Sequence, residues 1–314
     1  MATEAPFKHI VIIGPGAIGL CLAVHLARQG RRVTLIDHRP DRAARLSARP
    51  IRLRGPAGDV EATIPVRLAP DAPPDLVILA TKAHAACAAA GAAATWIGAA
   101  PVLLVQNGLG VAAEVAQALP QATVITAVLY QGANLTGEGE VHHVANLLVH
   151  VGYEGRPPDA AAEAVAAMLE AAGLPAHVAQ DMTPVVWGKL LVNAAINPVA
   201  AMAGVTNGAV AERPSLRAMA QAIAEEGEAA ARAAGVALPY PSAAAAARDT
   251  ACRTADNRCS MLQDLEAGRP TEIEYLNGAI VRVAEARAVA APANRAVASL
   301  VRQVSARPAT AAQT

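Results

Sequence analysis

Three polar side chains recur at intervals of four residues in an otherwise apolar segment, "WGKLLVNAAINP", which spans residues 187–198. They are Lys189, Asn193 and Asn197. In an α-helix, residues four apart are offset by only about 40° around the axis, so the three would form one slowly drifting stripe. Such a stripe predicts a helix that packs into a core while one edge borders a wet cleft. Pro198 follows Asn197 and predicts that the helix ends or kinks there.

A lysine in such a stripe could act as an acid. If its ammonium is partly buried, the pKa of Lys189 falls, and the side chain can then donate a proton near neutral pH. The alternative is that Lys189 extends to solvent while the asparagines cap or bridge neighbouring backbone groups. The spacing alone does not choose between these two interpretations.

A second polar cluster lies in "DNRCSMLQDLEAGRPTEIEYLNGAI", residues 256–280. The segment predicts a helix that carries Asn257, Ser260 and Asp264 on successive turns, a break at residues 268–270, and a second helix that Glu272 and Glu274 open. Acidic residues at a helix start are commonly just favourable partners of the helix dipole. The spacing does not say which of the two glutamates faces a cleft.

The start of the chain predicts the element that would bring a cofactor to this chemistry. This element is predicted by the stretch "KHIVIIGPGAIGLCLAVHLARQGRRVTLIDHRP". A β-branched run at residues 9–13 is followed by a glycine-rich turn and by a helical pattern that ends at Gly30. A short strand at residues 33–36 comes next, and Asp37 follows it. A G-x-G-x-x-G motif between a strand and a helix, with an acidic residue about twenty positions on, predicts a dinucleotide-binding βαβ unit.

Each residue of the motif has a physical role in that unit. Gly14 permits the tight turn, Gly16 lets the backbone approach the pyrophosphate, and Gly19 lets helix and strand pack closely. Ala17 and Ile18 lie at the helix N-terminus, whose amide groups would face the phosphates. The alternative is a glycine-rich turn that binds no ligand.

Asp37 bears on which dinucleotide binds. A carboxylate at the end of the second strand can accept hydrogen bonds from both adenosine ribose hydroxyls and would repel a 2′-phosphate, so it favours NAD. NADP is the alternative, because His38, Arg39 or Arg42 could meet a phosphate if the carboxylate turned aside.

Two further apolar runs, residues 75–84 and 100–110, end in polar or small residues. Buried parallel strands present their carboxyl ends to the ligand crevice in this way. Lys82 and Asn107 are therefore expected where cofactor and substrate meet. Residues 126–144 predict strands joined by a glycine-rich hairpin, in which His142 and His143 would point to opposite faces, an arrangement that disfavours a metal site formed by the two histidines.

The length of 314 residues predicts two domains. After Gly152 the strand pattern stops, so we expect an α/β protein with two domains. Residues 1–180 would form an N-terminal Rossmann-type domain with a doubly wound parallel sheet, and residues 181–314 would form an all-helical domain. A homodimer that associates through this helical domain is plausible.

Lys plus Arg and Asp plus Glu number 26 each, a balance that does not favour nucleic acid or an anionic membrane as partner.

Other features predict a cytoplasmic protein without a metal. The start lacks the features of a secretory signal, and apolar runs are interrupted before they reach the roughly eighteen to twenty residues of a membrane span. The four cysteines form no close metal-ligand pairs and are expected to be reduced thiols; they are Cys21, Cys87, Cys252 and Cys259.

The whole chain resembles the ketopantoate reductases, which reduce 2-dehydropantoate to pantoate in the pantothenate pathway. The motifs that carry the resemblance are "GPGAIG", "TKA" at residues 81–83, "QNGLG" at residues 106–110, "WGKLLVNAAINP" and "SMLQDLEAGRPTEIEYLNG" at residues 260–278. The last two are long and specific.

The resemblance implies a role for each candidate residue. Lys189 matches the general acid that protonates the C2 oxygen of the substrate, and Glu272 the glutamate that helps hold the substrate and the lysine. Asn193, Asn197, Asn257 and Ser260 match substrate-binding residues. Asn107 matches an asparagine beside nicotinamide and substrate, and Lys82 a lysine on the cofactor side. Glu274 is then a bystander, and the polar stripe lines the cleft between the domains.

Asp37 departs from the family pattern, because well-known members prefer NADP and carry neutral or basic residues there. An alternative is therefore an NAD-dependent dehydrogenase of a different, catabolic 2-hydroxy acid on the same scaffold. A more remote alternative is a non-catalytic protein that senses the dinucleotide. In the enzyme interpretations the partner is a small-molecule 2-oxo or 2-hydroxy acid.

Overall fold

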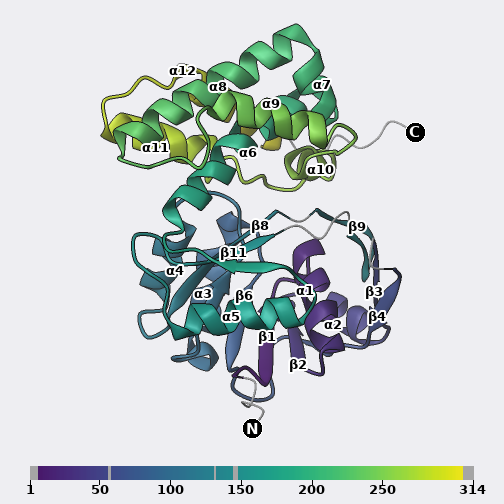
Figure 1. Cartoon of the computed structure of the whole chain (residues 1–314). Helices are drawn as coiled ribbons and strands as arrows, with labels where there is room; N and C mark the ends of the chain where they lie inside the picture. The colour runs from purple at the N-terminus through teal and green to yellow at the C-terminus, as the bar shows by residue number, and fades with distance from the viewer. Residues whose placement is uncertain (1–5, 56–57, 131, 144–147, 307–314) are drawn as a thin grey trace, which may run out of the picture. The chain divides into compact units, whose positions relative to one another are not determined.

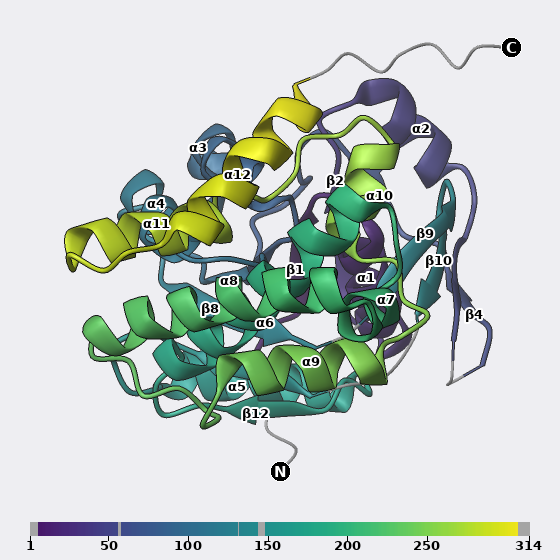
Figure 2. The same cartoon turned by 90° about the horizontal axis from the view of Figure 1, so that it is seen from above.

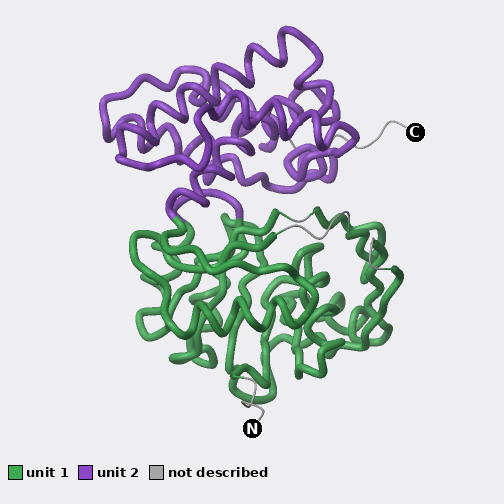
Figure 3. Tube along the Cα trace, viewed as in Figure 1, with its two compact units in different colours: residues 1–106, 111–182 green, residues 107–110, 183–314 purple. Residues whose placement is uncertain are grey.

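The computed structural model describes residues 6–55, 58–130, 132–143 and 148–306, and the chain divides into two compact units (Figures 1 and 3). The first unit comprises residues 1–106 and 111–182, and the second comprises residues 107–110 and 183–314. The second unit therefore starts two residues after the boundary expected from the sequence. It also contains a short segment, residues 107–110, that the sequence places in the first domain.

The first unit contains a main sheet of eight strands within the described residues. They are β1 (His9–Ile13), β2 (Arg32–Ile36), β5 (Val66–Arg67), β6 (Leu76–Leu79), β7 (Val102–Leu104), β8 (Val124–Leu129), β11 (Val149–Gly152) and β12 (Ala176–Val178). Their order is β12-β11-β8-β7-β6-β1-β2-β5. The pairs from β8 to β5 are parallel, whereas β11 pairs antiparallel with β8 and β12 pairs parallel with β11.

The position of β1 determines where a ligand can bind. All five residues of β1 are buried, as expected for a parallel strand covered on both faces. Ile10 pairs with Val33 of β2 on one side and with Leu76 of β6 on the other. The chain thus leaves β1 in one direction and later returns on its other side. This reversal is the switch point at which open α/β sheets bind ligands, at the carboxyl ends of the strands.

Helices cover both faces of this sheet. They are α1 (Ala17–Arg28), α2 (Pro40–Ser47), α3 (Ala83–Ile97), α4 (Val111–Ala118) and α5 (Ala160–Ala171). Figure 2 shows α1 on one side of the sheet and α3 with α4 on the other. Right-handed crossovers that run in opposite directions from the centre of a sheet place their helices on opposite faces. The predicted doubly wound fold is confirmed, and β12 is a strand after Gly152 that the sequence pattern missed.

A second, four-stranded sheet packs on α1. Its strands are β3 (Ile51–Arg54), β4 (Val60–Ala62), β9 (Ala133–Gly137) and β10 (Glu140–His143), in the order β4-β3-β10-β9. Ile51, Leu53 and Val141 belong to the same buried core as Leu20 and Leu22 of α1. The predicted hairpin is the antiparallel pair β9 and β10. His142 is exposed and His143 is buried, so the expectation that they point to opposite faces is confirmed.

The described residues of the second unit form helices joined by turns and loops, with no strand among them. Its helices are α6 (Thr183–Ala203), α7 (Asn207–Glu212), α8 (Pro214–Ala233), α9 (Ala243–Arg253), α10 (Ser260–Glu266), α11 (Asn277–Ala286) and α12 (Pro292–Ser305). The central helix α6 packs against α8, α9, α10 and α12. Its length and hydropathy would also suit a membrane span, but 72% of the apolar window is buried inside the structure, as in the core helix of a soluble protein.

The helix α6 does not end at Pro198 but continues to Ala203. Proline has no N–H, so the carbonyl of Ala194, four residues earlier, loses its helical donor. The side chain of Asn277 replaces it, because Nδ2 of Asn277 donates to the oxygen of Ala194 at 3.1 Å. Asn277 is fully buried and also donates to Oδ1 of Asn294 at 3.0 Å. A tertiary contact therefore satisfies the group that the sequence leaves without a partner.

Two local predictions in residues 256–280 are wrong. Asn257 lies before α10, because its N–H donates to the oxygen of Thr254 in the turn after α9, and its carbonyl accepts from the N–H of Asn207. Glu272 and Glu274 do not open a helix. The carbonyl of Glu272 accepts from the N–H of Tyr275 in a separate turn, and α11 begins only at Asn277.

Candidate active site

The glycine motif in the first unit has the geometry that a dinucleotide requires. Gly14 has φ +100°, and a Cβ there would lie 2.8 Å from the nitrogen of Thr81. A Cβ on Gly19 would lie 2.1 Å from the oxygen of Gly14. A Cβ on Gly16, in contrast, would meet no other atom within 4 Å. Gly14 and Gly19 thus allow the chain to pack tightly, whereas Gly16 leaves open space for a close ligand.

The start of α1 faces this open space. Gly16 is its N-cap residue, and the first turn contains no acidic side chain. The first N–H groups of a helix have no partner within the helix and carry partial positive charge. Ala17 and Ile18 are half-buried in that turn. These features fit the pyrophosphate of a dinucleotide.

Asp37 directly follows β2 and is held by cations. Its side chain is only 1% exposed. Oδ2 accepts from Nη1 of Arg42 at 3.0 Å, and Oδ1 accepts from the backbone N–H of Arg39 at 3.1 Å. Nη2 of Arg42 also donates to the oxygen of Pro15, so this arginine ties the glycine turn to Asp37. The exposed side chains of His38 and Arg39 lie 3.6 and 3.7 Å from Oδ1 of Asp37.

The carboxyl end of β6 lies next to the glycine turn. The backbone of Thr81 is the nearest neighbour of Gly14, and Lys82 caps the start of α3. Gln106, which follows β7, donates from Nε2 to the oxygens of Leu79 and Thr81 at 2.6 and 3.2 Å. Lys82 therefore lies at the switch point, and its contact with a cofactor stays a prediction.

Lys189 and Glu272 interact within the second unit. Lys189 is half-buried on α6, and Glu272 is 6% exposed in the turn before α11. Burial lowers the pKa of Lys189 to about 8, while the negative charge of Glu272 opposes that decrease. A lysine with this pKa is mostly charged at pH 7 and can release its proton in a reaction near neutral pH.

The asparagine stripe continues toward the start of α10. Asn193 and Asn197 are half-buried on α6. The thiol of Cys259, the N-cap residue of α10, donates to the backbone oxygen of Asn197 at 3.4 Å. Cys259 lies between the half-buried Asn257 and the exposed Ser260. The contact therefore places the start of α10 beside Asn197, at the end of the stripe.

Asn107 joins the second unit through its neighbours. The N–H of Leu109 donates to the oxygen of Tyr275 at 2.9 Å, and Gly108 has φ +106° with no room for a side chain against Tyr275. This contact holds Asn107 near the turn that carries Glu272. Oδ1 of Asn107 is buried and has no hydrogen-bond partner among the described residues. An amide in this state is ready to bind a ligand.

Sequence reasoning missed three positioning contacts. Arg42 appeared as a possible phosphate ligand, whereas it holds Asp37 and Pro15; Cys259 appeared as an ordinary thiol, whereas it fixes α10 against Asn197. Tyr275, which anchors residues 107–110, gave no signal at all. All three join residues across loops or between elements, which periodicity cannot reveal.

Comparisons with known proteins agree over most of the chain. Residues 10–155 match the family model described as ketopantoate reductase PanE/ApbA, and residues 181–305 match the model of its C-terminal part. A 2-dehydropantoate 2-reductase from Halobacterium salinarum is 36% identical, over 93% of this chain and 97% of the relative. One from Pyrococcus abyssi is 31% identical, over 91% and 94%.

Solved structures give the same result. A PanE/ApbA family ketopantoate reductase from Ralstonia eutropha superposes with a TM-score of 0.87 at 31% identity, covering 95% of this chain and 98% of that one. The ternary structure of D-mandelate dehydrogenase with NADH and anilino(oxo)acetate has the same TM-score at 25% identity, with the same coverage. With both family models matched in sequence order, the chain belongs to the ketopantoate reductase family.

Proposed function

We propose that this oxidoreductase reduces 2-dehydropantoate to pantoate with a nicotinamide cofactor. The observation that carries the proposal is the state of Lys189, because burial lowers the pKa of this lysine to about 8. Lys189 shares a polar stripe with Asn193 and Asn197, and the negative charge of the buried Glu272 acts on it. The 2-dehydropantoate 2-reductases among its relatives support the choice of substrate.

Lys189 supplies the proton in this mechanism. When bound, the nicotinamide supplies the hydride. As the C2 carbonyl accepts hydride, its oxygen becomes an alkoxide, and the ammonium of Lys189 stabilises that charge before transferring a proton from Nζ to it. Glu272 keeps Lys189 protonated, because its negative charge raises the pKa of the lysine.

The remaining polar residues of the second unit bind the substrate. Asn193 and Asn197 can donate to the carbonyl and carboxylate oxygens, and Asn257 and Ser260 can bind the hydroxyl or carboxylate end. Asn107, with its buried Oδ1, can accept a hydrogen bond from the nicotinamide amide or the substrate hydroxyl. These assignments rest on the family resemblance of the matching positions.

For the cofactor we keep NAD as the preferred nucleotide and NADP as the alternative. An ionised carboxylate has about four acceptor positions. At Asp37, Arg42 and the N–H of Arg39 use two of them, which leaves capacity for two ribose hydroxyls. His38 and Arg39 cover the carboxylate and must move aside for the ribose. If they stay, they present cations to a 2′-phosphate instead, which is the NADP arrangement.

A second candidate function is oxidation of a different 2-hydroxy acid by NAD. Its support is the similarity to D-mandelate dehydrogenase, whose structure contains NADH, together with Asp37 at the ribose position. In that direction Lys189 accepts the hydroxyl proton in its neutral form. A non-catalytic dinucleotide sensor is the remaining alternative, and a turnover assay separates it from both enzymes.

The cell compartment and assembly follow as proposals. All four cysteines of the chain are free, which suits a reducing compartment such as the cytoplasm. The second unit exposes the apolar side chains of Met202, Met219 and Leu300, which a homodimer would cover.

The experiment that tests the proposal is steady-state turnover of 2-dehydropantoate with NADH and with NADPH, alongside oxidation of pantoate and D-mandelate by NAD. Fast reduction of 2-dehydropantoate supports the main proposal, and the better cofactor decides the role of Asp37. If only D-mandelate is turned over, the main proposal is wrong and the second candidate function, oxidation of a different 2-hydroxy acid, replaces it. Binding of NADH without turnover of any 2-oxo or 2-hydroxy acid would leave only the sensor.

A further inference from the structure

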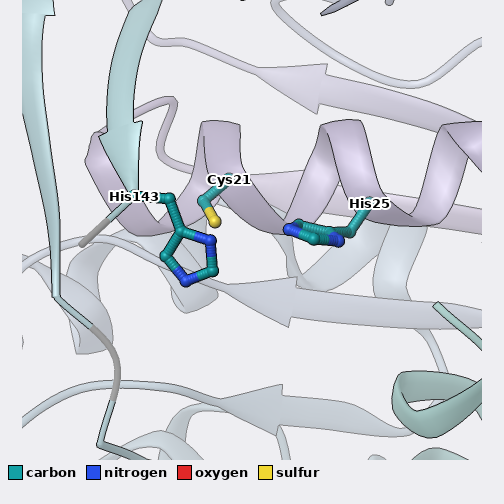
Figure 4. Close-up of side chains that lie close together, drawn as sticks. All are labelled: Cys21, His25 and His143. Atoms are coloured by element: carbon teal, nitrogen blue, oxygen red, sulfur yellow. The ribbon is translucent and has the colours of Figure 1, made fainter. Parts of the chain in front are cut away.

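Three side chains that commonly bind metals gather in the first unit, apart from every residue assigned above. Cys21 and His25 lie one turn apart on α1, and His143 lies on β10 (Figure 4). One ligand atom of each lies within 4.8 Å of those of the other two. Residues four apart share one face of a helix, so Cys21 and His25 both point toward β10. Figure 4 shows the sulfur of Cys21 between the two imidazole rings.

His25 is oriented as a metal ligand would be. Its Nδ1 lies 3.0 Å from the carbonyl oxygen of Ala172. Because a carbonyl only accepts, Nδ1 must carry the proton, and Nε2 then holds a lone pair. That Nε2 atom is buried and has no hydrogen-bond partner among the described residues. Metal-binding histidines typically donate their other N–H to a carbonyl or carboxylate in this way.

The site is buried and has no other evident role. Cys21 is 1% and His143 is 2% exposed, and Cys21 belongs to the core of the first unit. Burying a polar atom without a hydrogen bond costs free energy, so the buried Nε2 of His25 would gain from a compensating partner. Burial raises the pKa of Cys21 to about 12, so the thiol is protonated when no cation is near.

We propose that Cys21, His25 and His143 bind one Zn²⁺ ion, with water in the fourth position. One thiolate and two imidazoles form a donor set that suits Zn²⁺, whereas Mg²⁺ and Ca²⁺ prefer oxygen. Around a tetrahedral Zn²⁺ with bonds of about 2.0–2.3 Å, ligand atoms lie roughly 3.3–3.8 Å apart. The three atoms must therefore approach by at most about 1.5 Å, which side-chain rotation can supply. Binding forms the Zn–S bond and releases the thiol proton to solvent without any redox change.

The ion would connect two layers of the first unit. Cys21 and His25 belong to the helix that starts at the glycine turn, and His143 belongs to the four-stranded sheet that packs on this helix. Zn²⁺ would thus fasten the small sheet to α1 and stabilise the helix that receives the cofactor. This inference does not depend on the proposed reaction.

The test measures Zn²⁺ binding to the full chain after dialysis against a chelator, by competition with a chromogenic chelator. The wild-type protein should bind one equivalent and show a higher melting temperature with Zn²⁺ than without it. Cys21→Ser and His143→Gln each remove one ligand and should weaken binding by about a hundredfold or more. The matched controls Cys87→Ser and His142→Gln change an exposed thiol and the exposed neighbour of His143, and should bind as the wild type does.

Cobalt provides a readout that does not depend on variant stability. Co²⁺ bound to the wild type and to Cys87→Ser should show a thiolate-to-cobalt charge-transfer band in the near ultraviolet, and Cys21→Ser should lack it. The proposal is overturned if the wild type binds no stoichiometric Zn²⁺, or if binding survives unchanged in Cys21→Ser. If the ligand variants fail to fold, the Co²⁺ spectrum of Cys87→Ser decides, since absence of the band there rejects the site.

Discussion

Lys189 is the residue on which the proposed chemistry depends, because it combines a lowered pKa with a polar edge on a buried helix. Replacing Lys189 by Ala should reduce kcat for 2-oxo acid reduction by about a hundredfold or more, as expected for loss of a general acid.

The pH dependence of the wild-type rate tests the same lysine, because reduction needs its ammonium form. The wild-type rate should therefore be highest below a pH of about 8 and fall as the pH rises through that value. Oxidation needs the neutral amine and should show the opposite dependence.

Glu272 should set the position of that pH dependence. Its charge raises the pKa of Lys189, so Glu272→Gln should move the basic limb of the pH–rate profile for reduction to lower pH. The matched control is Glu274→Gln, which removes an acidic side chain two residues away that pairs with Arg302 instead. Rates measured from pH 6 to 10 test the prediction. An unchanged profile in Glu272→Gln would separate the glutamate from the function of the lysine.

Residue-level sequence reasoning identified the groups capable of chemistry but not the contacts that orient them. The types and spacing of Lys189, Asn193 and Asn197 follow from one helix, so local periodicity reveals them. The ion pair of Asp37 with Arg42 and the approach of His143 to Cys21 join residues from different elements. No period in the sequence encodes such pairs, so the sequence predicts only that Cys21 is a reduced thiol in apolar surroundings.

At the scale of elements, two variants of the glycine turn can separate an effect on dinucleotide binding from an effect on folding. Gly16→Ala meets no atom within 4 Å, and the φ of −82° at Gly16 suits alanine, so this variant should fold normally. Its methyl group occupies the space of the pyrophosphate, and the Kd for the dinucleotide should rise by about tenfold or more, since lost phosphate contacts cost at least 1.4 kcal/mol. Gly19→Ala places its Cβ 2.1 Å from the oxygen of Gly14 and should lower the melting temperature as well.

Fluorescence titration with NADH and thermal melting of both variants check this prediction. If Gly16→Ala binds the dinucleotide as tightly as the wild type does, the glycine turn is not the phosphate site.

The helix α6 offers a second prediction at this scale. Asn277→Leu removes the donor to the carbonyl of Ala194 and should destabilise the protein by about 1–3 kcal/mol, the cost of a buried unsatisfied group. Pro198→Ala restores an N–H at the position where a helix would supply one. In the Asn277→Leu background it should therefore recover part of the loss, and a double-mutant cycle by urea unfolding measures that coupling. Strictly additive effects would show that Asn277 does not compensate for the proline.

The predictability of the elements followed their regularity. The unit from β1 to β2 could be predicted almost residue by residue, because long buried strands and a glycine motif mark its limits. The strands β3, β4, β5, β11 and β12 were missed, since each has only two to four residues, and β3 and β4 also carry charged side chains. The turn at Glu272 was misplaced because its hydrogen bonds to Tyr275 and Leu276 replace the helical start that the composition favours.

At the scale of the whole molecule, the proposed nucleotide-binding and catalytic roles divide between the two units. The residues proposed to hold the nucleotide, apart from Asn107, lie in residues 1–106, whereas Lys189 and its partners lie in the second unit. Variants in the two units should therefore affect different steps. Lys189→Ala should lower kcat while leaving the Kd for NADH within a few fold of the wild-type value, and Gly16→Ala should do the reverse.

Calorimetry with NADH extends this division to stability. A ligand that binds only the folded state at a hundred times its Kd adds about 2.7 kcal/mol of stability. For a unit of 150–250 residues, 1 kcal/mol shifts the melting temperature by roughly 2–4 °C, so NADH should raise the transition of the first unit by roughly 5–10 °C. Proteins with two units often unfold in more than one step, and a separate transition of the helical unit should then move less. An equal shift of two resolved transitions, or a shift of the helical one alone, would show that the nucleotide is not held mainly by the first unit.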